Sequence, residues 1–196
     1  MTDVDTIKRA IANDGFAIIE NIYTTNEIDT ILLAITQAGI INPAYGKTPG
    51  LFAIRRFLKE VPEAVHAIFT SKLQAVITGL FGEAYFVVKS IYFDKPAETN
   101  WFVAWHQDLT ISVDKKIEAE GFGPWTVKHN QFGVQPPAGI LQDNFTIRIH
   151  LDDTDEYNGA LKVIPASHLK GIYRHQAEGN DVETVKICRI KRAASC

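Results

Sequence analysis

The sequence has few cysteines, no strong charge of either sign and no long apolar run. Its two cysteines, Cys188 and Cys196, cannot build a disulfide framework, which suits a reducing compartment. The 20 basic and 23 acidic residues give a net charge of −3, which leaves no electrostatic footprint for nucleic acid or anionic lipid. The longest aliphatic run, residues 31–35, is far too short for a membrane span. We therefore expect a soluble cytoplasmic protein that contacts neither nucleic acid nor membrane.

The size and composition are those of one ordinary domain. The chain has 196 residues, 46% of them hydrophobic and 22% charged, close to the average for globular proteins. Helical patterns fill the first part and short strand-like patterns the second. We expect a single domain over 1–196, with a helical part at 1–82 and strands over 83–190.

The helical part carries recognisable start signals. Thr24 followed by Glu27 has the spacing of a capping box, and Pro62 suits the first turn of a helix. The short apolar run at 16–19 favours a strand instead. Apolar residues at helical spacing predict helices around 7–11, 24–39, 62–69 and 71–79.

The second part is rich in β-branched and aromatic residues. Residues 109–144 are broken by several glycines and prolines, and we predict a long functional loop there, suited to closing over a substrate. Helices followed by many short strands predict an α+β fold or a helix-decorated β-barrel. The predicted strands cover 85–93, 101–106, 146–152, 161–164 and 183–190.

One short motif brings metal-binding chemistry. On an extended segment, His106 and Asp108 point the same way while Gln107 between them points oppositely. An imidazole and a carboxylate on one face supply two ligands of the two-His-one-carboxylate triad that holds Fe(II) in non-haem oxygenases. The same tripeptide also occurs by chance as a hydrogen-bonded surface pair.

The wider context resembles the phytanoyl-CoA dioxygenase family of Fe(II)- and 2-oxoglutarate-dependent oxygenases, over roughly residues 14–190. The resemblance implies a mainly β fold, a double-stranded β-helix (a jelly-roll, cupin-like barrel), with flanking N-terminal helices. It implies that His106 and Asp108 hold Fe(2+), and that dioxygen and a small-molecule substrate react there. The collinear segments that carry it are Phe93 to Pro96, Trp105 to Thr110, Gly121 to Trp125, Val134 to Pro137, Arg148 to Asp153 and Asn158 to His168.

Three further residues are candidates for binding the co-substrate 2-oxoglutarate. Alternation along 146–152 places Arg148 and His150 on the face opposite three aliphatic residues, and a guanidinium can hold a carboxylate by two hydrogen bonds. The competing interpretation of Arg148 is a solvated side chain paired with an acid. The resemblance places Gln107 and Ile91 close to the co-substrate. For His150 we expect a core or network histidine.

The end of the sequence departs from the family pattern. The family carries its second metal histidine and a carboxylate-clamping arginine on the last two barrel strands, whereas residues 191–196 fit no strand. We therefore expect a barrel that is missing its last strands and self-association through unpaired strand edges. Three functions stay open at this point: an active oxygenase, a catalytically inactive truncated relative, and a cupin-like module that binds a metal or another ligand.

Overall fold

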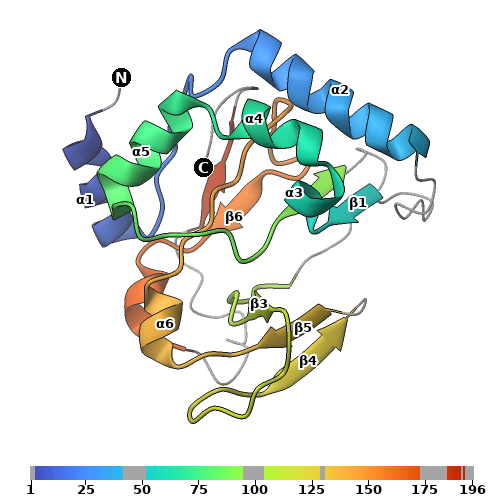
Figure 1. The fold of residues 1–196 in the computed structure, drawn as a ribbon. Coiled ribbons are helices and arrows are strands. Elements are labelled where there is room, and N and C mark those ends of the chain that lie inside the picture. The colour runs from blue at the N-terminus through green and yellow to red at the C-terminus, as the bar shows by residue number, and fades with distance from the viewer. Residues whose placement is uncertain are drawn as a thin grey trace.

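The computed structural model describes most of the chain. The described residues are 3–41, 52–94, 104–128, 131–172, 185–190 and 192. Figure 1 shows the larger helices gathered at one end of the molecule and a small sheet with helix α6 at the other.

Most of the helices lie in the first half of the chain, as predicted. No single helix in the described ranges is long and apolar enough to cross a membrane; the pair Pro62–Ile68 and Ser71–Phe81 passes that test only together, and it is bent by 70°. The helices are α1 (Val4–Asp14), α2 (Thr25–Ile41), α3 (Phe57–Glu60), the 3-10 turn η1 (Pro62–Ala64), α4 (Val65–Ile68), α5 (Ser71–Phe81), α6 (Ala138–Gln142) and the 3-10 turn η3 (Ser167–Lys170).

The capping box of α2 is confirmed. The Glu27 carboxylate accepts the Thr24 backbone N–H at 2.7 Å, and the Thr24 hydroxyl accepts the Glu27 N–H at 3.3 Å. The Thr24 hydroxyl also donates to the Glu27 carboxylate, at 2.9 Å, and the two hydrogen bonds that this carboxylate accepts from Thr24 hold the pKa of Glu27 below its ordinary value. Because both partners lie within one turn, the local sequence is sufficient to set this helix start.

The main core is built around α2 and is called the α2 core below. Ile28 and Ile31 of α2 and Ile54 of β1 (Phe52–Arg55) are almost completely buried in it. Ile147, Ile149 and Leu151 pack against it from a distant part of the chain. The buried members are Ile22, Tyr23, Ile28, Ile31, Ala34, Ile35, Ile54, Phe57, Val61, Ala64, Ile68 and Leu73.

The strands form three small antiparallel sheets, with orders β1-β2, β3-β5-β4 and β6-β7. Antiparallel sheets with flanking helices agree with the expected class, but the described strands form no closed barrel. The strands after β1 are β2 (Ile91–Asp94), β3 (Ile111–Val113), β4 (Trp125–Lys128), β5 (Gln131–Val134), β6 (Leu161–Val163) and β7 (Lys186–Cys188).

The prediction of a loop over residues 109–144 is wrong. This stretch holds the three-stranded sheet β3-β5-β4, followed by α6 (Figure 1). Its strands have only three or four residues, which is too few for an alternating pattern to stand out from the surrounding glycines and prolines. A long lid is therefore replaced, in the described part of this stretch, by a small folded unit.

Several predicted strands are shorter than expected or absent. Residues 16–19 form no named strand, and of 85–93 only the last three belong to β2. Tyr85 instead contacts the ring of Phe145, which stacks on Phe81 at 3.7 Å between centroids. Aromatic packing thus takes the place of a strand partner at this end of the segment.

The later strand predictions had mixed outcomes. Residues 104–106 form no strand, and 101–103 lie outside the described residues. Residues 146–149 alternate in burial, but the buried His150 breaks the pattern, and 146–152 form no named strand. β6 and β7 confirm the central parts of the predicted strands 161–164 and 183–190, while 183 and 184 are not described.

The end of α1 is fixed to η3 at a close approach. Gly15 has φ of +84° and donates its N–H to the Ile11 carbonyl oxygen. A Cβ at this glycine would lie 2.5 Å from Nδ1 of His168, whose Nε2 lies 3.3 Å from the Ala12 carbonyl oxygen. Only a residue without a side chain fits both the positive φ and the histidine ring.

We predict that Gly15→Ala lowers the free energy of unfolding by about 2–3 kcal/mol, since the positive φ costs about 1 kcal/mol and the contact with His168 adds to it. In a His168→Ala background the same change should cost only about 1 kcal/mol. Urea denaturation of the wild type, the two single variants and the double variant measures the coupling free energy between residues 15 and 168. Equal costs in the two backgrounds would show that His168 does not contact residue 15.

Candidate metal and co-substrate site

The segment that carries His106 and Asp108 is irregular, yet it keeps the predicted alternation. His106 and Asp108 are exposed, whereas Gln107 between them is half-buried. The Gln107 side-chain amide donates a hydrogen bond of 2.8 Å to the carbonyl oxygen of Gly171. Gln107 therefore ties this segment to the end of η3, and the two potential ligands flank that anchor.

The hydrogen bond of His106 decides which ring nitrogen is available. Nδ1 of His106 lies 2.8 Å from the carbonyl oxygen of Ala104. A carbonyl oxygen can only accept, so the bonded Nδ1 carries the proton and the neutral ring leaves Nε2 with a free lone pair. Metal-bound histidines have this arrangement, because a carbonyl that holds one ring nitrogen orients the other toward the metal. The hydrogen bond to Ala104 therefore favours the tautomer that a metal ligand requires.

The described residues supply two ligand side chains but not a complete metal centre. Across these ranges, no group of three or more His, Cys, Asp or Glu side chains could hold a metal ion. His106 and Asp108 fit Fe(II) by donor type and by order along the chain, and His129 and His175 lie outside the described residues. By donor type, these two side chains match two of the three ligands of a facial triad, and their role as metal ligands stays a prediction.

Arg148 lies on the exposed side of an alternating segment. Its neighbours Ile147 and Ile149 pack against the α2 core, whereas the Arg148 side chain is exposed. Its Nη2 donates to the carbonyl oxygen of Gly159 at 3.4 Å. The predicted alternation is thus confirmed for the aliphatic face, and Arg148 is placed beside the turn at residues 156–159.

Ile91, Gln107 and Arg148 come from three separate places in the fold. Ile91 is half-buried at the start of β2, opposite Arg55 of β1. Gln107 contacts Gly171, and Arg148 contacts Gly159. Their shared role in binding 2-oxoglutarate therefore stays a prediction.

His150 is the buried polar residue of this region, with only 4% of its surface exposed. Its Nδ1 lies 3.0 Å from the Thr154 hydroxyl. The backbone of Thr154 is bonded in both directions to Ile190, at 2.8 and 3.0 Å. Nε2 is buried without a partner among the described residues. These contacts confirm a core histidine, but they separate it from the exposed face that alternation assigned to it with Arg148.

The surroundings of His150 oppose its protonation. Burial, followed by the positive charge of Arg148, lowers the pKa of His150 to about 4. Alternation alone places residue 150 on the same side as Arg148, so the burial agrees with the expected core histidine and not with the alternation. The stability that comes from keeping a buried histidine neutral is complete above the pKa of the unfolded chain. It is lost as the pH falls from there toward the lower pKa of the folded chain.

The comparisons with known proteins identify the family. A family model described as phytanoyl-CoA dioxygenase matches residues 11–191. No curated protein matches the chain. Since the match covers most of the sequence, the chain belongs to the phytanoyl-CoA dioxygenase family, whose members are generally Fe(II)- and 2-oxoglutarate-dependent oxygenases with a jelly-roll fold.

We predict that the protein loses stability in mild acid because of His150. Its pKa lies at about 4 in the folded chain and at its ordinary 6.5 in the unfolded chain. Stability should be complete above about pH 7 and should fall as the pH drops through this window, by about 2 kcal/mol at pH 5, since each pKa unit is worth about 1.4 kcal/mol.

Urea denaturation at several pH values measures this slope. His150→Gln removes the titrating group and should flatten the curve, although it lowers stability at neutral pH. His66→Gln, at an exposed position on α4, is the matched control and should keep the wild-type slope. The same slope in His150→Gln as in the wild type would refute the assignment.

Proposed function

We propose that this member of the phytanoyl-CoA dioxygenase family is an Fe(II)- and 2-oxoglutarate-dependent oxygenase that hydroxylates a small organic molecule. His106 and Asp108 are the proposed metal ligands. The observation that carries the proposal is the hydrogen bond from His106 Nδ1 to the Ala104 carbonyl, which leaves Nε2 free to bind a metal. When bound, Fe(II) supplies the sites at which 2-oxoglutarate and dioxygen bind and react.

In this proposal the protein positions the reacting groups. The hydrogen bond from Gln107 to Gly171 holds the segment between the two ligands, so that their side chains stay on the same side of it. Asp108 contributes negative charge, which offsets part of the charge of the cation. A neutral histidine and a carboxylate are the donors that a non-haem iron site uses.

Arg148 is the proposed partner of a 2-oxoglutarate carboxylate. The Arg148 side chain is exposed, and its Nη2 donates a long hydrogen bond of 3.4 Å to the Gly159 carbonyl oxygen. A guanidinium can hold a carboxylate by two charge-assisted hydrogen bonds. Gln107 and Ile91 are proposed to lie near the co-substrate on the strength of the family pattern.

Self-association through strand edges stays a separate prediction, which gel filtration tests.

We predict that His106→Ala and Asp108→Asn each weaken metal binding at least about tenfold, because each removes one ligand of an open site. Anaerobic calorimetry with Fe(II) or Co(II) measures the affinity. Succinate formed from 2-oxoglutarate measures the coupled activity, which should fall to background in both variants.

The matched controls are His66→Ala and Asp143→Asn, which change the same residue types at exposed positions elsewhere. Both should bind metal like the wild type. Metal affinities of His106→Ala and Asp108→Asn within twofold of the wild type would exclude the pair as ligands. Metal binding with no succinate above background would favour the binding module over the oxygenase.

A further inference from the structure

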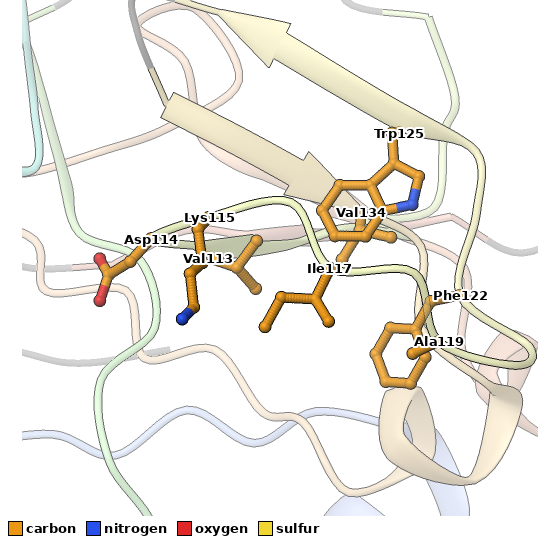
Figure 2. A pocket seen from close by; sticks show the side chains of 8 residues that line it. All are labelled: Val113, Asp114, Lys115, Ile117, Ala119, Phe122, Trp125 and Val134. Atoms are coloured by element: carbon orange, nitrogen blue, oxygen red, sulfur yellow. The ribbon is translucent and has the colours of Figure 1, made fainter.

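A pocket of about 370 Å³ lies against the small sheet β3-β5-β4, in the stretch where a loop was expected (Figure 2). This volume falls within the range of roughly 300–1,000 Å³ typical of small-molecule sites. The exposed surface of its wall is almost entirely apolar. The apolar lining consists of Val113, Ile117, Ala119, Phe122, Trp125 and Val134.

The floor of this pocket is held by the sheet. Val134 is completely buried, and in the central strand β5 it faces Ile111 of β3 and Trp125 of β4. Beyond the strand ends, the Gly123 N–H donates to the Gln135 carbonyl oxygen at 2.9 Å, which extends the pairing. This floor is hydrogen-bonded before a ligand enters, so binding costs little free energy for ordering the sheet.

The charged groups at the pocket leave no net positive charge there. Figure 2 shows Asp114 and Lys115 at the end away from Trp125 and Phe122. The neighbouring Lys116 is in an ion pair with Glu118 at 3.5 Å. These two cations and two carboxylates cancel, and Glu120 on the same segment adds a further negative charge, so the mouth has no net positive field to hold the several phosphates of a coenzyme A thioester. A single anionic group can still pair with Lys115.

The pocket lies close to the proposed metal ligands along the chain. Asp108 precedes Val113, which lines the pocket, by five residues. Five extended residues span at most roughly 18 Å, which is an upper limit for the distance between the backbone of Asp108 and the pocket wall at Val113.

We propose that this pocket binds an aromatic or alicyclic small molecule with at most one anionic group. Trp125 and Phe122 supply flat apolar surfaces for a ring, and Lys115 supplies one cation at the rim. That such a molecule, rather than a coenzyme A thioester, is the substrate class rests on the proposed oxygenase function. The binding itself does not rest on it.

Titration of the full chain with 2-naphthoate, in the absence of metal, tests the pocket. The readouts are calorimetry and quenching of tryptophan fluorescence, and we expect saturable binding tighter than about 1 mM. Decanoyl-coenzyme A should bind at least about tenfold more weakly. The reverse order of affinities would overturn the proposed ligand class.

Two variants separate a shaped pocket from general stickiness. Ile117→Gln should weaken 2-naphthoate binding about tenfold, because an amide would face the apolar ligand without a partner. Val127→Gln is the matched control: Val127 is 61% exposed and Ile117 55% exposed, but Val127 does not line the pocket. Equal effects of the two changes would overturn the proposal.

Ala119→Phe makes the stretch more apolar while it fills the pocket. A shaped pocket should lose binding at least about tenfold, whereas adsorption to an apolar surface would become stronger and would overturn the proposal. Metal titration of the wild-type chain keeps the two proposals apart. A wild-type chain that binds metal but not 2-naphthoate refutes the pocket, and one that binds 2-naphthoate but not metal refutes the metal site.

Discussion

The packing of one alternating segment onto the α2 core connects the two halves of this protein. Ile147, Ile149 and Leu151 lie more than a hundred residues after α2 and still share its core. Because neighbouring side chains on an extended backbone point in opposite directions, packing Ile147 and Ile149 against the core turns Arg148 between them away from it, although the alternation does not hold at the buried His150. The exposure of its guanidinium is therefore a consequence of apolar packing, and the core positions a proposed co-substrate ligand without touching it.

The orientation of His106 and Asp108 depends on weaker interactions than the apolar packing around Arg148. His106 and Asp108 are exposed, and two hydrogen bonds, to the carbonyl oxygens of Ala104 and Gly171, orient their segment. Each such bond contributes only about 1 kcal/mol. A bound cation would add far more than these contacts, so metal binding and ordering of this segment are expected to be linked. In the absence of metal, the hydrogen bond to the Ala104 carbonyl oxygen favours the tautomer of His106 with the proton on Nδ1.

Sequence reasoning succeeded where a structure is local or where the motifs are long. The α2 capping box joins Thr24 to Glu27 within one turn, and the collinear motifs identified the family although no single tripeptide could. The buried His150 ring contacts the Thr154 hydroxyl, and the Thr154 backbone is bonded to Ile190; no local pattern encodes this contact between Thr154 and Ile190. The sheet β3-β5-β4 escaped notice because strands of three or four residues carry almost no periodic signal.

Replacing the expected lid by a small sheet changes how selectivity must arise. A closing loop gains specificity by ordering itself around the correct substrate, and that ordering costs free energy at every turnover. A wall fixed by the pairing of Val134 with Ile111 and Trp125 has been ordered during folding. Selectivity at such a wall comes from shape and from the unfavourable burial of polar groups that lack partners. In the proposed enzyme, His106 and Asp108 hold the metal that carries out the reaction, and the pocket that begins at Val113, five residues after Asp108, selects the substrate.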